Sequence, residues 1–471
     1  MKLYNTLTRS KDEFRTRTEG KLSMYTCGPT VYHYAHIGNL RSYIMEDVLE
    51  KYFRYSGYDV KRVMNITDVG HLSSDGDTGD DKMLKGAKRE HKSVMEIADF
   101  YTKAFFEDCK KLNIKTPDVV EPATNCIDEF IRVISELIEK GFAYEAGGNI
   151  YFDTSKLEKY YVFNDFNEED LAVGVREGVE EDSNKRNKAD FVLWFTKSKF
   201  DDQELKWESP WGVGYPGWHI ECSCISMKYC GEYLDIHCGG IDNAFPHHTN
   251  EIAQSEAYLG HEWCGQWFHV HHLNTDSGKM SKSKGEFLTV SLLEEKGYDP
   301  LVYRFFCLQS HYRKSLVFSW ENLDNAAAAY EKLTAKIAGI LEVSGDTDAE
   351  KCAVLKKNFT DAMDNDLNTA LAVTAVYDVL KADVSNKDKL SLIEDFDRVL
   401  SLGLIEAAKK YAEKNAGTDD IPEEVKALAE QRKAARKEKN FALADEIRDK
   451  ITALGYVITE TREGTKITRK Q

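Results

Sequence analysis

A strand, a helix and a second strand follow one another between residues 21 and 66, and this order restricts the fold more than any other feature. Residues Lys21–Thr26 alternate apolar and polar side chains as a strand does, and Asp59–Ile66 form a second such segment. Between them, apolar side chains recur at helical spacing from His36 onward, and Gly57 is a typical stop. The order predicts a βαβ unit with parallel strands, whose ligands bind beyond the carboxyl ends of the strands.

The segment 218–251 concentrates cysteine and histidine side chains that can bind a metal ion. Pro246 suits the first turn of a helix, because its missing N–H costs nothing there. A helix that starts there places His247 and Glu251 at positions i and i+4, where their side chains meet on one face. A histidine and a carboxylate so placed, with Cys222 upstream, are typical zinc ligands. The alternative is a half-buried cysteine and histidine that make ordinary hydrogen bonds.

A fourth zinc ligand must come from another part of the chain. Cys224 cannot serve together with Cys222, because the C-x-C spacing points the two sulfurs apart on a helix. Cys27 follows the first predicted strand and lies at the carboxyl end, where ligands bind. Cys238 ends the strand-like segment YLDIHC and is the rival candidate. The residues alone leave both alternatives open.

Composition narrows the class of protein. The 471 residues include 42% hydrophobic and 30% charged ones, which is ordinary for a globular chain with two or three domains. No window reaches the apolar length of a membrane-spanning helix, and the first residues lack the apolar core of a signal peptide. We therefore expect a cytoplasmic protein without membrane contact. Its ten cysteines are then reduced thiols or metal ligands.

The charge is distributed unevenly along the chain. A net charge of −17 argues against a general nucleic-acid-binding protein. Residues 421–471, however, contain 12 Lys and Arg against 9 Asp and Glu, a net charge of +3. A helix predicted after Pro422 carries Arg432, Arg436 and Lys439 at positions i, i+4 and i+7. The change of sign predicts a separate C-terminal module with its own partner.

These patterns predict an α/β fold class with several parts. A Rossmann-type parallel-sheet domain is expected over residues 1–319, and an insertion at about 141–214 splits its sheet. The insertion has a hairpin-like segment at 149–155 and a charged segment at 177–190. Apolar residues at helical spacing within 320–343, 367–384 and 389–404 predict a helical bundle over 320–411. A small α+β module of two helices and a hairpin is expected over 421–471.

A lysine-rich segment follows the last strand of the sheet domain. In NTDSGKMSKSKGEF, lysines and serines alternate between two glycines around Met280. Such a loop cannot belong to a hydrophobic core, and its ammonium groups can bind phosphates. A solvated surface turn is the alternative, and this segment alone does not exclude it.

Two short motifs fall together on this framework. His36-Ile37-Gly38-Asn39 opens the predicted helix, and Lys279-Met280-Ser281-Lys282-Ser283 follows the sheet. Together, in this order, they resemble the HIGH and KMSKS motifs of class I aminoacyl-tRNA synthetases. With Cys27 before the first motif, and WHIEC and the FPHHxNE pattern between the two, the chain resembles the cysteinyl-tRNA synthetase family over nearly its whole length.

The resemblance implies roles for particular residues. It implies a zinc site formed by Cys27, Cys222, His247 and Glu251. It implies a cysteine pocket lined by Thr67, Trp218 and Asp242. It also implies that ATP is bound by His36, Gly38, Asn39 and Lys282, and that the chemistry is assisted by His36, Asn39, Lys279 and Lys282.

Two positions depart from the family pattern. Asn39 stands where the name-giving motif has histidine. An asparagine can donate a hydrogen bond but cannot transfer a proton, so it can only stabilise charge. Cys238 stands where the family usually has glycine. We interpret Cys238 as a buried, small apolar residue, with an oxidisable neighbour of the zinc site as the alternative.

The implied function is a cysteine–tRNA ligase. It activates L-cysteine with ATP to cysteinyl-adenylate and transfers cysteine to the 3′ end of cysteine tRNA, as a monomer. One Zn²⁺ per chain selects the thiol, and Mg²⁺ accompanies ATP. One rival is an ATP-dependent cysteine ligase with a small amine acceptor, which has no need of a basic C-terminal module. The other is an inactive zinc protein that only binds RNA, which has no need of the lysine loop.

Overall fold

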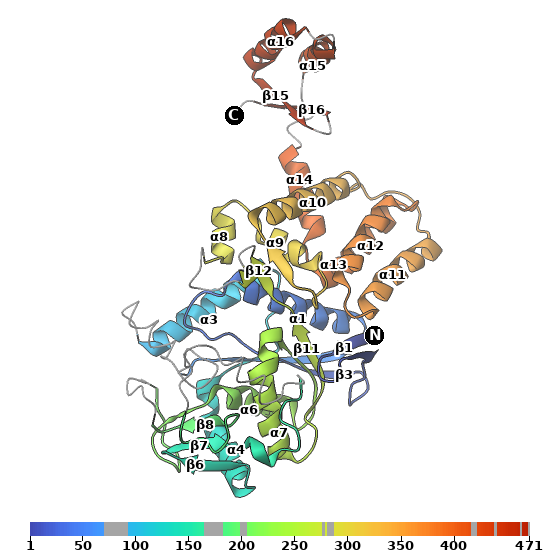
Figure 1. Cartoon of the computed structure of the whole chain (residues 1–471). Helices are drawn as coiled ribbons and strands as arrows, with labels where there is room; N and C mark the ends of the chain where they lie inside the picture. Colours follow the sequence, from blue (N-terminus) through green and yellow to red (C-terminus); the bar gives the residue numbers. More distant parts are fainter. Residues whose placement is uncertain are drawn as a thin grey trace.

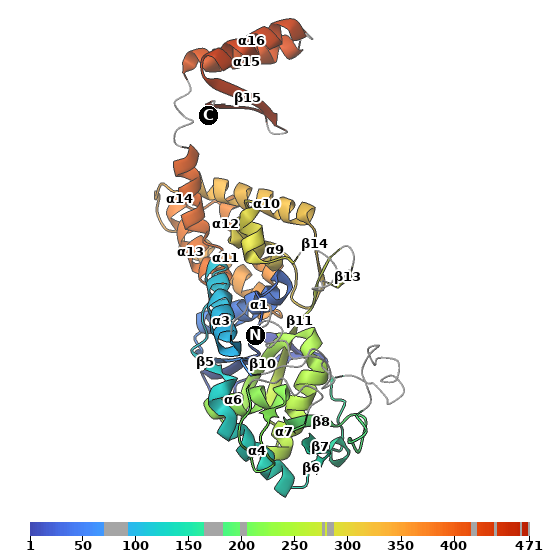
Figure 2. The ribbon, with the colours of Figure 1, turned by 90° about the vertical axis from the view of Figure 1, so that its left-hand side faces the viewer.

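The computed structural model describes residues 1–69, 93–163, 182–197, 205–275, 278–279, 287–415, 422–437, 440–461 and 464–469. A small antiparallel sheet lies at one end, the central sheet follows, and a group of helices lies beyond it (Figures 1 and 2). The C-terminal module occupies the far end, past helix α14 (Leu404–Asn415). This order of parts confirms the predicted fold class.

The central sheet has five parallel strands in the order β11–β10–β3–β4–β5. They are β3 (Lys21–Thr26), β4 (Asp59–Ile66), β5 (Val119–Pro122), β10 (Leu234–Gly240) and β11 (Cys264–Val270). Strands β3 and β4 have the predicted bounds and pair in parallel from Lys21 opposite Asp59 to Thr26 opposite Met64. The βαβ prediction is therefore confirmed.

Helices pack on both faces of this sheet. One face contacts α1 (Ile37–Tyr55), and α9 (Pro300–Leu308) packs on α1; the other face contacts α6 (Trp218–Cys230), on which α7 (Thr249–Leu259) packs. The side chains of neighbouring residues in a strand point to opposite faces of the sheet, as the two-residue period requires. Met24 joins the hydrophobic cluster around α1, whereas Tyr25 joins the cluster around α6 and α7.

A second, antiparallel sheet interrupts the central one between β5 and β10. It has the order β6–β7–β8–β9, with β6 (Ala143–Ala146), β7 (Asn149–Phe152), β8 (Phe191–Phe195) and β9 (Tyr215–Pro216). Helix α4 (Ile127–Glu139) precedes it and contacts α6 and α7. The predicted insertion thus contains a four-stranded sheet, of which the sequence indicated only hairpin strands near Asn149.

Three short strands join the central sheet to the helices. They are β12 (Leu273–Thr275), β13 (Gly278–Lys279) and β14 (Leu316–Phe318), and β12 pairs with both of the others. A hairpin of β1 (Lys2–Asn5) and β2 (Ser10–Glu13) packs beside β11. Helix α3 (Val94–Lys111) begins at the capping residue Ser93 and packs beside α1 through Phe105, which contacts Tyr43.

Helices dominate the chain after β13. The group comprises α8 (Val290–Glu295), α10 (Trp320–Ala338), α11 (Ala349–Asp364), α12 (Thr369–Lys381), α13 (Asn386–Leu400) and α14, together with α9. The sequence predicted α10, α12 and α13 but not α11 or α14. Among the helices that the structure describes, none has both the length and the apolar character needed to cross a membrane.

The C-terminal module has the predicted two helices and hairpin. They are α15 (Glu423–Lys437), α16 (Phe441–Ala453), β15 (Tyr456–Thr461) and β16 (Gly464–Arg469). Val425 and Ala429 pack against Ile447 and Ile451 to form its own small core. Arg432 and Arg436 lie on α15, while Lys439, the third residue of the predicted basic stripe, falls outside the described residues.

Candidate functional site

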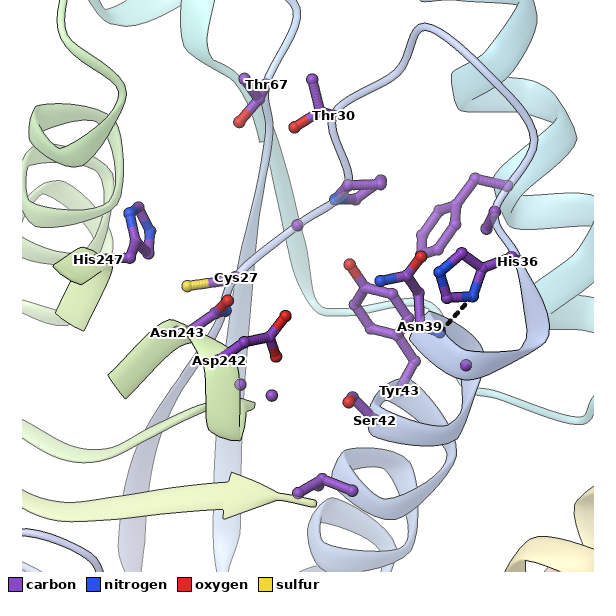
Figure 3. Close-up of a pocket in the computed structure, with 18 of the residues that line it drawn as sticks. Cys27, Thr30, His36, Asn39, Ser42, Tyr43, Thr67, Asp242, Asn243 and His247 are labelled. Carbon is purple, nitrogen blue, oxygen red and sulfur yellow. Dashed lines mark hydrogen bonds between the residues drawn. The ribbon is translucent and has the colours of Figure 1, made fainter. Parts of the chain in front are cut away.

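A pocket of about 380 Å³ opens at the carboxyl ends of β3, β4 and β10. Figure 3 shows side chains from several elements turned toward it: Cys27 after β3, Thr67 after β4, His36 and Asn39 at the start of α1, and His247 before α7. Parallel strands place the residues that follow them at one edge of a sheet, which is why segments far apart in sequence meet here.

Four potential metal ligands meet at one side of the pocket: Cys27, Cys222, His247 and Glu251. The two sulfurs lie 3.9 Å apart, and Cys222 Sγ lies 3.5 Å from His247 Nε2. Glu251 Oε1 lies 3.0 Å from His247 Nε2 and 3.9 Å from Cys27 Sγ. The predicted contact of His247 with Glu251 is therefore present.

The regular helix around these residues begins later than the sequence indicated. Pro246 lies in a π-helical turn, Ala244–His248, in which Phe245 has non-helical backbone angles, and α7 starts only at Thr249. The turn still carries His247 onto the helical face of Glu251, because the two side chains remain one turn apart.

The distances within the cluster suit a tetrahedral zinc ion. Zinc bonds of about 2.3 Å to sulfur and about 2.0–2.1 Å to nitrogen or oxygen give tetrahedral edges of about 3.8 Å between sulfurs, about 3.6 Å from sulfur to nitrogen or oxygen, and about 3.4 Å from nitrogen to oxygen. The four separations given above differ from the corresponding edges by no more than about 0.4 Å. A donor set of two sulfurs, one imidazole and one carboxylate is also one that zinc accepts.

Two histidines outside the cluster hold its ligands in place. His237 Nε2 lies 2.7 Å from Glu251 Oε2, so the carboxylate keeps only Oε1 for the cluster. His219 Nδ1 lies 2.9 Å from Nδ1 of His247, which leaves Nε2 of His247 facing Cys222. Supporting hydrogen bonds of this kind fix the orientation of metal ligands in proteins.

The charge of His247 and the charges of Glu251 and Cys222 stabilise one another. Burial would raise the pKa of Glu251, but His237 and His247 beside it lower this pKa to about 2. Burial would lower the pKa of His247, but Glu251 and Cys222 raise it to about 10. For Cys222, burial is outweighed by the hydrogen bond from Cys27 and the charge of His247, and its pKa falls to about 6. Glu251 and Cys222 therefore favour the ionised forms that bind metal.

A second set of four overlaps the first: Cys27, His237, His248 and Glu251. His248 Nε2 lies 3.3 Å from Cys27 Sγ and 3.9 Å from Glu251 Oε1. The 2.7 Å between His237 and Glu251 is a hydrogen-bond length, about 0.7 Å shorter than the edge between two ligands of one zinc ion. The first set therefore fits a single zinc ion better.

The other cysteines considered from the sequence lie elsewhere. Cys238 is fully buried in the hydrophobic cluster on the α1 side of the sheet, while its neighbour His237 reaches Glu251 on the opposite side. Cys224 is buried in the core around α4 and α6. Neither belongs to either group of potential ligands in the described part of the chain. The burial of Cys238 among apolar side chains favours its interpretation as a small apolar residue.

The first turn of α1 forms the opposite wall of the pocket. His36 is its N-terminal cap, and its Nδ1 accepts a hydrogen bond from the backbone N–H of Asn39 at 3.3 Å (Figure 3). The ring lies so close to Gly38 that a Cβ there would come within 2.7 Å of it, so a larger residue at this position would displace the His36 ring. The side chains of Asn39 and Tyr43 line the pocket from successive turns.

The three residues assigned to the cysteine pocket also line this cavity. Thr67 Oγ1 donates a hydrogen bond to Glu221 Oε2 at 2.8 Å. Trp218, the first residue of α6, stacks on the ring of His247 with 4.3 Å between ring centres. Asp242 is exposed in the short turn Ile241–Asn243.

The lysine-rich motif is only partly described. Lys279 lies in β13, where its backbone pairs with Asn274 of β12, and its side chain is outside the description. Lys282 falls outside the described residues. Strand β12 follows the pocket residues His271 and His272, so the motif begins beside the pocket.

The sequence did not indicate three residues that support the site. Asn65 Oδ1 accepts a hydrogen bond from the N–H of Gly28 at 2.8 Å and lies 3.7 Å from Cys222 Sγ. A Cβ at Gly28 would lie 1.6 Å from the backbone oxygen of Asn65, so this close contact requires glycine. The other two supporting residues are His219, which contacts His247, and His237, which contacts Glu251. The alternation of strand β10 could have assigned His237 to the face opposite Cys238.

Comparison with known proteins identifies relatives of the whole chain. Residues 13–328 match the model of the tRNA synthetases class I (C) catalytic domain. Residues 358–402 match the DALR domain, and residues 418–466 match the cysteinyl-tRNA ligase anticodon binding domain.

Individual proteins match over nearly their full length. A cysteine–tRNA ligase of Treponema denticola is 47% identical, with 98% of both chains covered. Another, from Caldicellulosiruptor saccharolyticus, is 42% identical with 100% of both chains covered. Among solved structures, a methionyl-tRNA synthetase of Mycobacterium tuberculosis in complex with methionyl-adenylate has a TM-score of 0.53 at 15% identity, covering 83% of this chain and 91% of the other. At that identity the likeness concerns the fold alone.

Proposed function

The chain belongs to the class I cysteinyl-tRNA synthetase family, and from this membership we propose that it activates L-cysteine with ATP and transfers it to the 3′ end of cysteine tRNA. One observation carries the assignment of residues. The cluster of Cys27, Cys222, His247 and Glu251 shares a pocket with the first turn of α1. A thiol-binding end and a phosphate-binding end are what cysteine activation requires.

Activation needs no general base, because the carboxylate of cysteine is already ionised at neutral pH. One carboxylate oxygen attacks the α-phosphorus of ATP, and the bond from that phosphorus to the pyrophosphate oxygen breaks. The rate must therefore come from positioning and from stabilisation of charge on the phosphates. We assign these tasks to His36, Gly38 and Asn39 at the positive end of α1, and to Lys279 and Lys282. Mg²⁺ is expected with the ATP phosphates.

We assign the choice of amino acid to the cluster. Its residues would hold Zn²⁺, which supplies a soft cation that lowers the pKa of a nearby thiol and prefers thiolate to the hydroxyl of serine. Thr67, Trp218 and Asp242, which line the same pocket, are assigned to the remaining parts of cysteine. Trp218 also stacks on His247 and so couples this wall of the pocket to the cluster.

In the second step a ribose hydroxyl at the 3′ end of tRNA attacks the carbonyl carbon of the adenylate, and AMP leaves. The match of residues 418–466 to an anticodon binding domain supports tRNA as the acceptor, rather than a small amine. The domain boundaries, the monomeric state and the cytoplasmic location stay predictions.

The test is a charging assay with purified protein, ATP, labelled cysteine and cysteine tRNA. We expect cysteine to be recovered as an ester on the 3′ end of the tRNA, dependent on ATP. Exchange of ATP with pyrophosphate in the presence of cysteine, without any charging of tRNA, would instead indicate a small-molecule acceptor.

A further inference from the structure

Arg41 lies in α1, two residues after Asn39, and its side chain is fully buried. Its guanidinium donates four hydrogen bonds, all to backbone carbonyl oxygens. Nη1 binds the carbonyls of His271 and His272 at 2.5 and 2.8 Å. Nη2 binds the carbonyls of His311 and Lys314 at 3.3 and 2.7 Å. One side chain of α1 thus holds two separate segments of backbone.

Both segments lead directly into the small sheet that carries the lysine motif. His272 precedes β12, which pairs with β13 and therefore with Lys279. Lys314 lies two residues before β14, the other partner of β12. The two segments also bind each other, because the N–H of Leu316 donates to the carbonyl of His272 at 3.0 Å. Arg41 therefore fixes the start of both strands at once.

Arg41 differs from the other fully buried arginines in having no carboxylate partner among the described residues. Arg62 pairs with Glu50, and Arg304 pairs with Asp47. Burial lowers the pKa of Arg41, which reflects the cost of a charge held only by carbonyl dipoles. An apolar side chain would avoid this cost, but it could not hold four carbonyls in a fixed arrangement.

We propose that Arg41 is a positioning residue for cysteine activation: it fixes strands β12 and β14, and with them β13 and its Lys279, relative to the helix start that carries His36 and Asn39. This proposal deepens the proposed function and rests on it. Arg41 touches neither substrate in this account; it acts through the backbone of β12 and β14. The two phosphate-binding elements come from α1 and from β13, which are separate parts of the chain, and Arg41 joins them.

The consequence is specific to the chemical step. A displaced β13 would misplace Lys279 relative to the phosphates, where charge is redistributed, and a shift of about 1 Å can cost about 100-fold in rate. Cysteine itself is bound on the other side of the pocket, near Cys27 and Cys222, which Arg41 does not contact. Loss of Arg41 should therefore lower kcat and leave the KM for cysteine nearly unchanged.

The experiment is ATP–pyrophosphate exchange with Arg41→Lys, with rates normalised to the number of active sites titrated. Lysine keeps the charge but has one ammonium group, which cannot span four carbonyls. We expect kcat to fall by about 10- to 100-fold, with the KM for cysteine within about twofold of the parent. Arg304→Lys is the matched control. Arg304 is equally buried and binds the carbonyls of Leu400 and Leu112, but contacts neither segment of the small sheet. It should lose stability and keep kcat.

A double-mutant cycle with Lys279→Ala identifies the route by which Arg41 acts. If Arg41 works through β13 and Lys279, Arg41→Lys should cost much less in the Lys279→Ala background than in the parent. Full additivity, an unchanged kcat in Arg41→Lys, or equal losses of kcat in Arg41→Lys and Arg304→Lys would overturn the proposal. If Lys279→Ala keeps the parent rate, the role proposed for the loop is wrong and that of Arg41 falls with it. If Lys279→Ala is slow but Arg41→Lys is not, only the positioning role is wrong.

Discussion

Glu251 uses its two carboxylate oxygens for different tasks. Oε1 faces His247 and Cys27, while Oε2 is held by His237 at 2.7 Å. A carboxylate with no solvent exposure is costly unless its charge is compensated, and here two imidazoles compensate it. The same residue is therefore both a potential metal ligand and the link between the cluster and strand β10.

The ligand assignment makes a direct prediction for Cys222. The variant Cys222→Ser should lose most of its zinc, because a serine hydroxyl is a hard and weakly acidic donor. Metal analysis of the purified protein measures this. Cys224→Ser, two residues along the same helix and outside the cluster, is the matched control and should keep one zinc per chain. Full zinc in Cys222→Ser would favour the overlapping set that contains His237 and His248.

Asp108 provides a test of stability against pH. It lies buried in α3, and burial raises its pKa from 3.8 to about 6. Between about pH 4 and pH 6 the folded state therefore binds more protons than the unfolded state, and this group's contribution to stability is lost as the pH rises through that window.

The variant Asp108→Asn should remove this loss. We expect its free energy of unfolding to exceed that of the parent by about 2 kcal/mol at pH 8, and by much less at pH 4, as measured by urea denaturation. Asp99→Asn, which removes an exposed carboxylate from the same helix, should show no such dependence on pH. An equal difference at both pH values would contradict the assignment.

At the scale of elements, the sequence predicted best where a segment has one clear period. Strands β3 and β4 matched their predicted bounds, and β3 is followed by Gly28 and Pro29, which do not continue a buried strand. Helical backbone follows the non-helical Phe245 and so begins at Pro246, as predicted, but the first turn is π-helical and α7 itself starts at Thr249. The helix α11 was missed, because its apolar face is short and much of its surface is exposed.

The lysine-rich motif at 279–283 is expected to act in the chemical step rather than in the binding of cysteine. The variant Lys282→Ala should slow formation of cysteinyl-adenylate strongly, by about 100-fold or more, because its ammonium matters most when charge moves among the phosphates. Binding of cysteine alone, measured by calorimetry, should be nearly unchanged. Parallel losses in cysteine affinity and in rate would point to a structural role for the loop instead.

At the scale of the whole molecule, the site depends on topology that no local pattern contains. The strand order β10–β3–β4 brings Cys27 and Asn65 to one edge of the sheet, and α6 and α7 then supply Cys222 and Glu251. The resemblance to a family named the four residues of the cluster in advance. The contacts by which Asn65 and His219 support the cluster could not be derived from the sequence, because they join segments more than 25 residues apart.

The C-terminal module has its own core and follows the helices at the far end of the chain (Figure 2). A chain that ends near Lys414 should therefore still exchange ATP with pyrophosphate in the presence of cysteine. It should charge tRNA poorly, because the module with a net charge of +3 is absent. Unimpaired charging by the shortened chain would mean that the basic face of α15 is only solvated surface.

The discrimination between cysteine and serine tests the central claim most directly. We would measure kcat/KM for ATP–pyrophosphate exchange with each amino acid, using protein that carries one zinc per chain. A pocket selecting by size alone discriminates by about 10- to 200-fold, so selection by a metal-bound thiol site predicts a ratio well above 1,000 in favour of cysteine. A ratio within the range that size alone provides, or faster exchange with an amino acid that has no thiol, would contradict the account.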